Sequence, residues 1–158
     1  MHLISWKDTC KPKIYCGLSI PSIESLYYAC GCNIAARGLS VGTSCAFCNS
    51  NFETQNHLFF ECDFTFSILL RFLPRMQSML FRPNLWQVYS DIEELDVTSN
   101  MKNYYFLSIS AIVYFIWRSR NDRLFGNCSE SVSAITSKIK RAVYLKIHRK
   151  KCFQDMLT

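Results

Sequence analysis

Residues 45–62 read CAFCNSNFETQNHLFFEC, and the fold that we expect for the chain depends on this segment. Two residues separate Cys45 from Cys48, and His57 and Cys62 follow after gaps of eight and four residues. A short turn lets both sulfurs of a C-x2-C pair bind one metal ion, and two further side chains complete a tetrahedron. Because four protein ligands leave no position for water, the spacing predicts a structural zinc site of three cysteines and one histidine.

Two other interpretations of these cysteines stay open at the level of sequence. The four side chains could be inert buried thiols and a core histidine, which is common for a single Cys or His. A second possibility is an all-thiolate site that recruits Cys30 and Cys32, although C-x-C is a poorer metal hook. Four residues at usable spacing within one short segment favour the site of mixed sulfur and nitrogen ligands over both alternatives.

Length, composition and the N-terminal residues limit the class of protein. The 158 residues, 49% of them hydrophobic, suffice for one modest core. The sequence MHLISWKDTCKPK has no apolar stretch of the signal-peptide kind, so we expect a nuclear or cytoplasmic protein that is not secreted and whose cysteines are reduced. The most apolar run, residues 104–117, is too short to span a bilayer, so we expect no membrane partner.

The net charge of +6 is concentrated at one end of the chain. Residues 1–137 hold eleven Lys and Arg and eleven Asp and Glu, whereas residues 138–158 hold seven Lys and Arg against Asp155 alone. The sequence therefore combines a neutral body with a basic tail.

The spacing of apolar residues predicts a mainly helical domain organised around the zinc site. A short extended segment precedes it, because prolines favour extended backbone in residues 6–23, and a short helix follows over residues 24–30. In the zinc segment itself, residues 49–53 are expected to form a turn, and Thr54 to cap a short helix with His57 in its first turn. Leu58, together with Phe59 or Phe60, would then pack under the metal as core rather than as a platform for stacking bases.

Two helices are expected directly after the zinc segment. The first covers residues 64–73, with Asp63 as its cap and Pro74 as its end. The second starts at Asn84 and covers residues 85–97. Acidic residues crowd the end of the second helix, where they oppose the helix dipole, so we expect it to stop early.

The longest helix is expected to begin at Ser99 or Asn100 and to run to about Phe125. Its nearly continuous apolar residues imply burial on more than one side, which makes it the central helix of the domain. Gly126 or Asn127 supplies its end. Three arginines near that end are assigned a capping and solvating role in preference to contact with nucleic acid: Arg118, Arg120 and Arg123.

The last helix is expected to be amphipathic and basic, with Ser129 or Ser131 as its cap. Its buried stripe comprises Val132, Ile135, Ile139, Val143 and Ile147. Six basic residues lie mostly away from that stripe: Lys138, Arg141, Lys146, Arg149, Lys150 and Lys151. Such a face suits the phosphates of RNA or DNA, an anionic membrane or an acidic partner, and the alternative is a merely solvated surface. Because lysines contact phosphate without reading bases, we expect any nucleic-acid binding here to be weakly sequence-selective.

No catalytic constellation is visible in the sequence. The chain lacks the paired aspartates of a two-metal polymerase, a Gly-rich phosphate loop and a histidine with a partnered nucleophile. We therefore expect a protein that is not an enzyme.

Three phrases of the sequence resemble one known family. ISWKDTCKPKIYCGLSIPSIESL is similar to the segment that follows the polymerase core in reverse transcriptases of plant non-LTR retrotransposons, CAFCNSNFETQNHLFFEC is similar to the zinc-binding domain found after it, and WRSRNDRLF to the sequence that often trails that domain. The resemblance implies that Cys45, Cys48, His57 and Cys62 are the zinc ligands. It also implies three parts, namely a post-polymerase remnant over 1–36, the zinc-binding helical domain over 37–126 and the basic helix over 127–158.

What the resemblance implies for function is a role in holding element RNA or DNA for a polymerase that this chain lacks. The family has a much longer segment before the zinc ligands, so residues 31–38 are interpreted as a deletion junction. Two hypotheses follow. The chain is either a non-catalytic zinc-binding module that binds nucleic acid, or a structural or protein-interaction remnant of a retroelement without independent activity.

Overall fold

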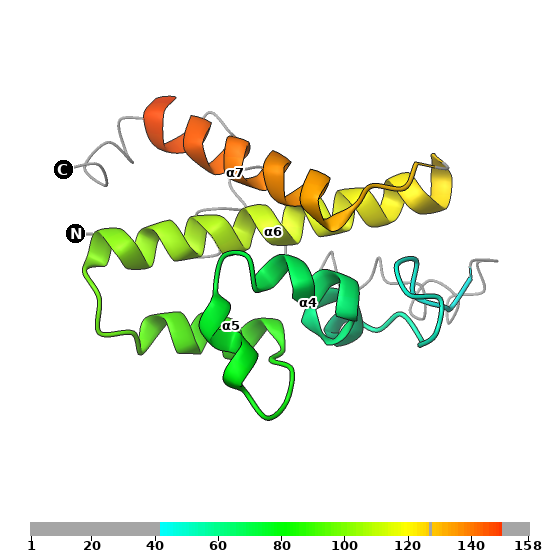
Figure 1. Cartoon of the computed structure of the whole chain (residues 1–158), viewed down its shortest axis with the longest axis horizontal. Coiled ribbons are helices and arrows are strands. Elements are labelled where there is room, and N and C mark those ends of the chain that lie inside the picture. The colour runs from blue at the N-terminus through cyan, green and yellow to red at the C-terminus, as the bar shows by residue number, and fades with distance from the viewer. Residues whose placement is uncertain (1–41, 127, 150–158) are drawn as a thin grey trace.

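The computed structural model describes residues 42–126 and 128–149. The elements, in chain order, are η2 (His57–Glu61), α4 (Asp63–Leu69), η3 (Pro74–Ser78), α5 (Leu85–Glu93), α6 (Ser99–Phe125) and α7 (Val132–Arg149) (Figure 1). Among the described residues there is no strand, only an isolated antiparallel bridge between Ser44 and Phe52, so the predicted mainly helical fold is confirmed. The expectations for the extended N-terminal segment, the helix over 24–30, the junction and the rival ligands Cys30 and Cys32 lie outside the described residues.

Helix α6 is the centre of the fold. It contacts α4, α5, α7 and η2, and in Figure 1 α7 lies above it and α5 below. Leu107, Ile112 and Ile116 are fully buried, which confirms the predicted burial on more than one side. Among the described helices, none combines the length and apolarity needed to cross a bilayer.

The two ends of α6 fall where the sequence predicted them. Thr98 caps its start by accepting a hydrogen bond from the amide of Met101 at 3.3 Å, and Gly126 ends it. A Cβ at Gly126 would lie 2.9 Å from the carbonyl oxygen of Asp122, so the close approach of the backbone at this point favours glycine. Helix α7 then begins after Ser131, whose hydroxyl accepts from the amide of Ala134 at 3.2 Å.

Helix α7 packs its predicted stripe against α6 and α4. Ile135, Ile139 and Val143 are at most 4% exposed, so one face of this basic helix is part of the domain core. The stripe is confirmed, and Lys138, Lys140 and Arg141 are exposed away from it, whereas Lys146 is partly buried.

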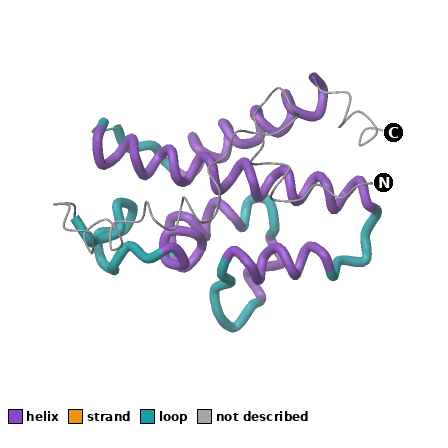
Figure 2. Tube along the Cα trace, turned by 180° about the vertical axis from the view of Figure 1, so that it is seen from behind, coloured by secondary structure: helices purple, strands orange, loops and turns teal. Residues whose placement is uncertain are grey.

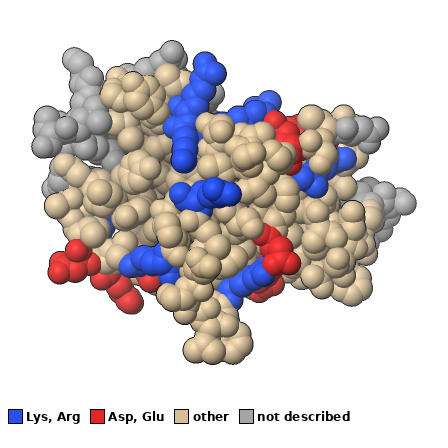
Figure 3. Space-filling model, in the orientation of Figure 1, with Lys and Arg blue, Asp and Glu red and all other residues tan. Residues whose placement is uncertain are grey.

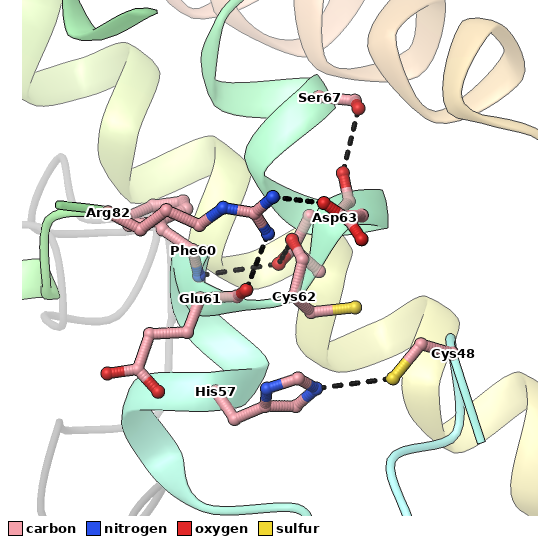
Figure 4. A network of polar contacts seen from close by, with 9 residues as sticks. Cys48, His57, Phe60, Glu61, Cys62, Asp63, Ser67 and Arg82 are labelled. Carbon is pink, nitrogen blue, oxygen red and sulfur yellow. Dashed lines mark hydrogen bonds and ion pairs between the residues drawn. The ribbon is translucent and has the colours of Figure 1, made fainter. Parts of the chain in front are cut away.

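Helix α4 differs from its prediction at both ends. Asp63 is the first helical residue rather than the cap, and its carboxylate pairs with Arg82, which also donates to the carbonyl of Glu61 at 2.6 Å (Figure 4). The helix ends at Leu69 rather than at residue 73, because the amide of Phe72 turns back to the carbonyl of Leu69 and the last turn tightens. The connector that was expected over residues 75–83 contains the short helix η3.

Helix α5 matches its prediction closely. Asn84 and Gln87 form a reciprocal capping box at its start, each side chain accepting from the other's backbone amide. It ends at Glu93, short of residue 97, as the crowding of acidic residues predicted.

Candidate metal centre

The structure brings the four predicted ligands together. One ligand atom each from Cys45, Cys48, His57 and Cys62 lies within 4.8 Å of all the others. The sulfurs of Cys45 and Cys62 are 3.9 Å apart. Cys48 Sγ is 3.3 Å from His57 Nε2 (Figure 4). The edges of a tetrahedron with zinc at its centre measure about 3.5–3.8 Å for these atom types. The two distances are close to these edges, so the group could hold one metal ion.

The first two ligands are held by a short backbone loop. The amide of Cys45 donates to the carbonyl of Asn51, and the amide of Asn49 donates to the carbonyl of Cys45, at 2.8 and 2.9 Å. Asn49 has a φ of 56°, a left-handed conformation that asparagine tolerates better than most residues. The amide of Phe47 points at Cys45 Sγ from 3.4 Å, which favours a thiolate at that position.

The other two ligands are presented by η2. Thr54 Oγ1 accepts from the amide of His57 at 3.0 Å, so the predicted cap is confirmed and His57 lies in the first turn. The amide of Cys62 donates to the carbonyl of His57, five residues earlier, at 2.9 Å. This π-helical turn contains one residue more than an α-helical turn. Within this turn Phe60 has a φ of 94°, which is a strained conformation for a bulky residue. The surrounding core must stabilise this conformation.

The apolar residues between the ligands belong to the core. Leu58, Phe59 and Phe60 are at most 1% exposed, which confirms that they pack as core rather than as a stacking platform. The core is therefore continuous from the metal cluster into the helices.

A hydrogen bond couples the two buried sulfurs, those of Cys45 and Cys62. The thiol of Cys45 donates to the sulfur of Cys62, which lowers the pKa of Cys62 to about 5, with smaller contributions from the amides of Phe64 and Thr65. The same hydrogen bond, together with burial, raises the pKa of Cys45. A metal ion binds the deprotonated sulfurs and would displace their protons, so metal affinity should fall in acid.

Residues 45–62, which carry the four predicted ligands, are called the metal loop below. A buried ion pair joins this loop to the central helix. Arg120 in α6 donates from Nε and Nη2 to the carboxylate of Glu53, at 2.6 to 3.2 Å, and both side chains are at most 3% exposed. The expected capping and solvating role is therefore wrong for Arg120, although it suits Arg118, which is exposed and lies 3.7 Å from Asp122. Sequence reasoning missed this pair because no periodic signal connects residues 67 positions apart.

A second arginine makes a parallel connection. The guanidinium of Arg123 lies 4.7 and 4.6 Å from the ring centroids of Phe47 and Phe64, which stack on each other. It also donates to the carbonyl oxygens of Ala46 and Glu130, at 3.3 and 3.0 Å. Arg123 therefore ties the C-x2-C loop to α4 and to the turn that precedes α7, which again differs from a solvating role.

The predicted basic residues lie on α7 rather than at the metal cluster. Lys138 and Arg141 are exposed, with Lys138 paired to Glu130, and Lys146 is partly buried. The side chain of Arg149 and residues Lys150 and Lys151 lie outside the described part of the structure. Figure 3 shows Lys and Arg side chains over α7. Lys140 is exposed on the same helix and was missed, although its place beside Arg141 is visible in the sequence.

We expect His57→Ala to lower the metal content of the purified protein well below one ion per chain, because three sulfurs alone leave the tetrahedron incomplete. Elemental analysis measures this directly. The matched control is His148→Ala, which removes an exposed histidine whose ring lies next to that of Tyr144 in α7. Equal metal content in the two variants would contradict the assignment of His57 as a ligand.

Comparison of the chain with protein-family models, with curated proteins and with solved structures found no match. The function of the chain therefore has to be inferred from its own residues and their contacts.

Proposed function

We propose that this chain is a non-catalytic zinc-binding module, similar to the C-terminal region of a plant retrotransposon reverse transcriptase, that holds RNA or DNA without strong sequence preference. The observation that carries the proposal is the convergence of Cys45, Cys48, His57 and Cys62 on one point. These are the residues that the family likeness assigns as ligands.

The donor set favours zinc as the metal. Thiolates are soft ligands that select zinc over magnesium or calcium, and a tetrahedral set of sulfur and imidazole donors is typical of structural zinc. Because all four positions are taken by side chains, the ion would stabilise the loop and take no part in chemistry.

The position of the basic residues supports nucleic acid as the partner. The net positive charge of the chain lies in residues 138–158, and α7 turns Lys140 and Arg141 to solvent while its apolar stripe is buried. Such a helix presents its cations to a phosphate backbone without needing to rearrange. Contacts of this kind position a nucleic acid without reading its sequence.

We expect Lys140→Ala/Arg141→Ala to weaken binding of single-stranded RNA and to reduce the slope of log affinity against log salt by about 1 for each phosphate that the variant no longer neutralises. Fluorescence anisotropy at several salt concentrations measures both quantities. The matched control is Arg75→Ala/Arg82→Ala, which removes the same charge from the segment between α4 and α5. Equal weakening in the two double variants, or binding by the wild type that ignores salt, would rule out α7 as the contact surface.

A second candidate function, a protein-interaction or structural remnant, is favoured by one observation. The loop between η3 and α5, which projects at the bottom of Figure 1, exposes Leu80 and Phe81 by 94% and 83%, and the neighbouring Trp86 is 64% exposed. Exposed apolar side chains grouped in this way commonly mark protein contacts. If the wild type binds no RNA or DNA at low salt, this second function replaces the first.

A further inference from the structure

A pocket of about 380 Å³, wide open to solvent, lies beside the C-x2-C loop. Its lining comes from two segments, the C-x2-C loop and the end of α6 with the turn that follows it, which lie at the same end of the molecule in Figures 1 and 2. The lining residues are Ala46, Asn49, Arg123, Leu124, Cys128 and Ser129. The volume is in the range of pockets that hold small organic groups.

The chemistry of the lining favours a flat group with a polar edge. Among the described residues that form the wall, Arg123 is the single cation, and none is Lys, Asp or Glu. One cation is a poor match for a free phosphate, which is usually held by several donors. Ala46 and Leu124 provide apolar contact, while Asn49 and Ser129 provide polar atoms, and a nucleobase has this combination of apolar faces and polar edge.

Arg123 is already held in place. Its guanidinium lies over Phe47 and Phe64, and hydrogen bonds to the carbonyl oxygens of Ala46 and Glu130 use two of the five N–H groups that a guanidinium carries. A cation held in this way loses little conformational freedom when a ligand arrives. Because arginine only donates, it selects a base edge with two adjacent acceptors. Guanine offers such an edge at O6 and N7 and unpaired cytosine offers one at N3 and O2, and the larger ring of guanine covers more of the apolar wall.

We propose that this cavity takes up one unpaired guanine of a single-stranded nucleic acid, with Arg123 donating to the acceptor edge of the base. The inference rests on the proposed function and deepens it. The basic face of α7 would hold the backbone without sequence preference, and the cavity would add a preference at one nucleotide.

Cys128 provides a direct readout, because it is exposed and lines the cavity. Tryptic cleavage after Arg123 and Lys138 gives a peptide in which Cys128 is the one cysteine. The zinc-loaded wild type is alkylated with N-ethylmaleimide in the presence of a short oligouridine or of the same oligomer with one central guanosine. We expect the guanosine oligomer to slow alkylation of Cys128 by about tenfold and oligouridine to slow it little, in proportion to the discrimination that one bidentate contact provides.

Two variants separate the cavity from the overall fold. Arg123→Lys keeps the charge and removes the planar fork, and Ser129→Trp fills the cavity from the turn before α7 without altering the guanidinium. Both are expected to bind oligouridine as the wild type does and to lose the preference for guanosine. Zinc content confirms that each variant is folded, and Ser129→Trp decides the matter if Arg123→Lys loses its metal.

The outcomes distinguish the two proposals. Binding of both oligomers with equal alkylation of Cys128 would overturn the guanine site and leave the proposed function standing. No binding of either oligomer would overturn both. A deoxyribose oligomer with one guanine is expected to protect Cys128 equally, because the contacts are made to the base, and failure to protect would overturn base recognition.

Discussion

Removal of the metal ion with a strong chelator is expected to abolish most of the helical circular dichroism signal at room temperature. Structural zinc contributes about 10–16 kcal/mol in small zinc modules, which is as large as the total stability of about 5–15 kcal/mol that a domain retains. The effect should reach the helices because Leu58, Phe59 and Phe60 lie between the ligands and are part of the same core as α6. The strained φ of Phe60 would also lose its support.

The matching variants are Cys62→Ser and Cys128→Ser. Both replace one cysteine by serine, yet Cys62 is a buried member of the cluster and Cys128 is exposed outside it. We expect Cys62→Ser to lose metal and cooperative thermal unfolding, and Cys128→Ser to behave as the wild type. A chelated protein with an unchanged Tm would show that the helices fold without the ion, and the architecture would then need another explanation.

Arg120→Ala is expected to destabilise the protein by about 3–5 kcal/mol, the usual cost of leaving one member of a buried ion pair without its partner. The carboxylate of Glu53 is 1% exposed and accepts hydrogen bonds from Arg120 at 2.6 to 3.2 Å. Without the guanidinium the carboxylate would lose the charge that offsets its desolvation. Denaturant unfolding of the zinc-loaded protein measures the destabilisation.

Arg118→Ala is the control for this prediction. It removes an arginine two positions away whose pair with Asp122 is exposed, and such pairs contribute about 0–1 kcal/mol. The double variant Glu53→Leu/Arg120→Met should recover much of the stability, since replacing both partners leaves no buried charge. If Arg118→Ala and Arg120→Ala cost the same, the buried pair would not be what joins the metal loop to α6.

The pair and the metal should be coupled, because they constrain the same loop from two sides. Glu53 lies between Cys48 and His57 in the chain, so loosening it widens the distribution of distances between the ligands. Arg120→Ala should therefore also lower the affinity for zinc, whereas Arg118→Ala should not. Since both variants remove the same charge, a difference between them in a zinc titration reports the buried pair rather than the net charge of the chain.

Local signals account for much of the agreement between sequence and structure. The caps Thr54, Asn84 and Ser131 act over three residues, and the stripe on α7 repeats with the turn of a helix. The cap assigned to Asp63 failed because Cys62 occupies the cap position, so Asp63 is the first helical residue and pairs with Arg82 instead. The end assigned to α4 failed because a tightened turn stops the helix before Pro74 acts.

The four ligands, the order of the described helices and the face that each helix buries could be inferred from the order of residues, because metal spacing and helical periodicity depend on neighbours within a few turns. The folded arrangement was needed to find that Arg120 is buried against Glu53, that Arg123 stacks on Phe47 and Phe64, and that a pocket lies beside the C-x2-C loop. These features depend on which surfaces meet when α6 packs against the metal loop. The spacing of residues in the sequence does not indicate which residues this far apart in the chain are in contact.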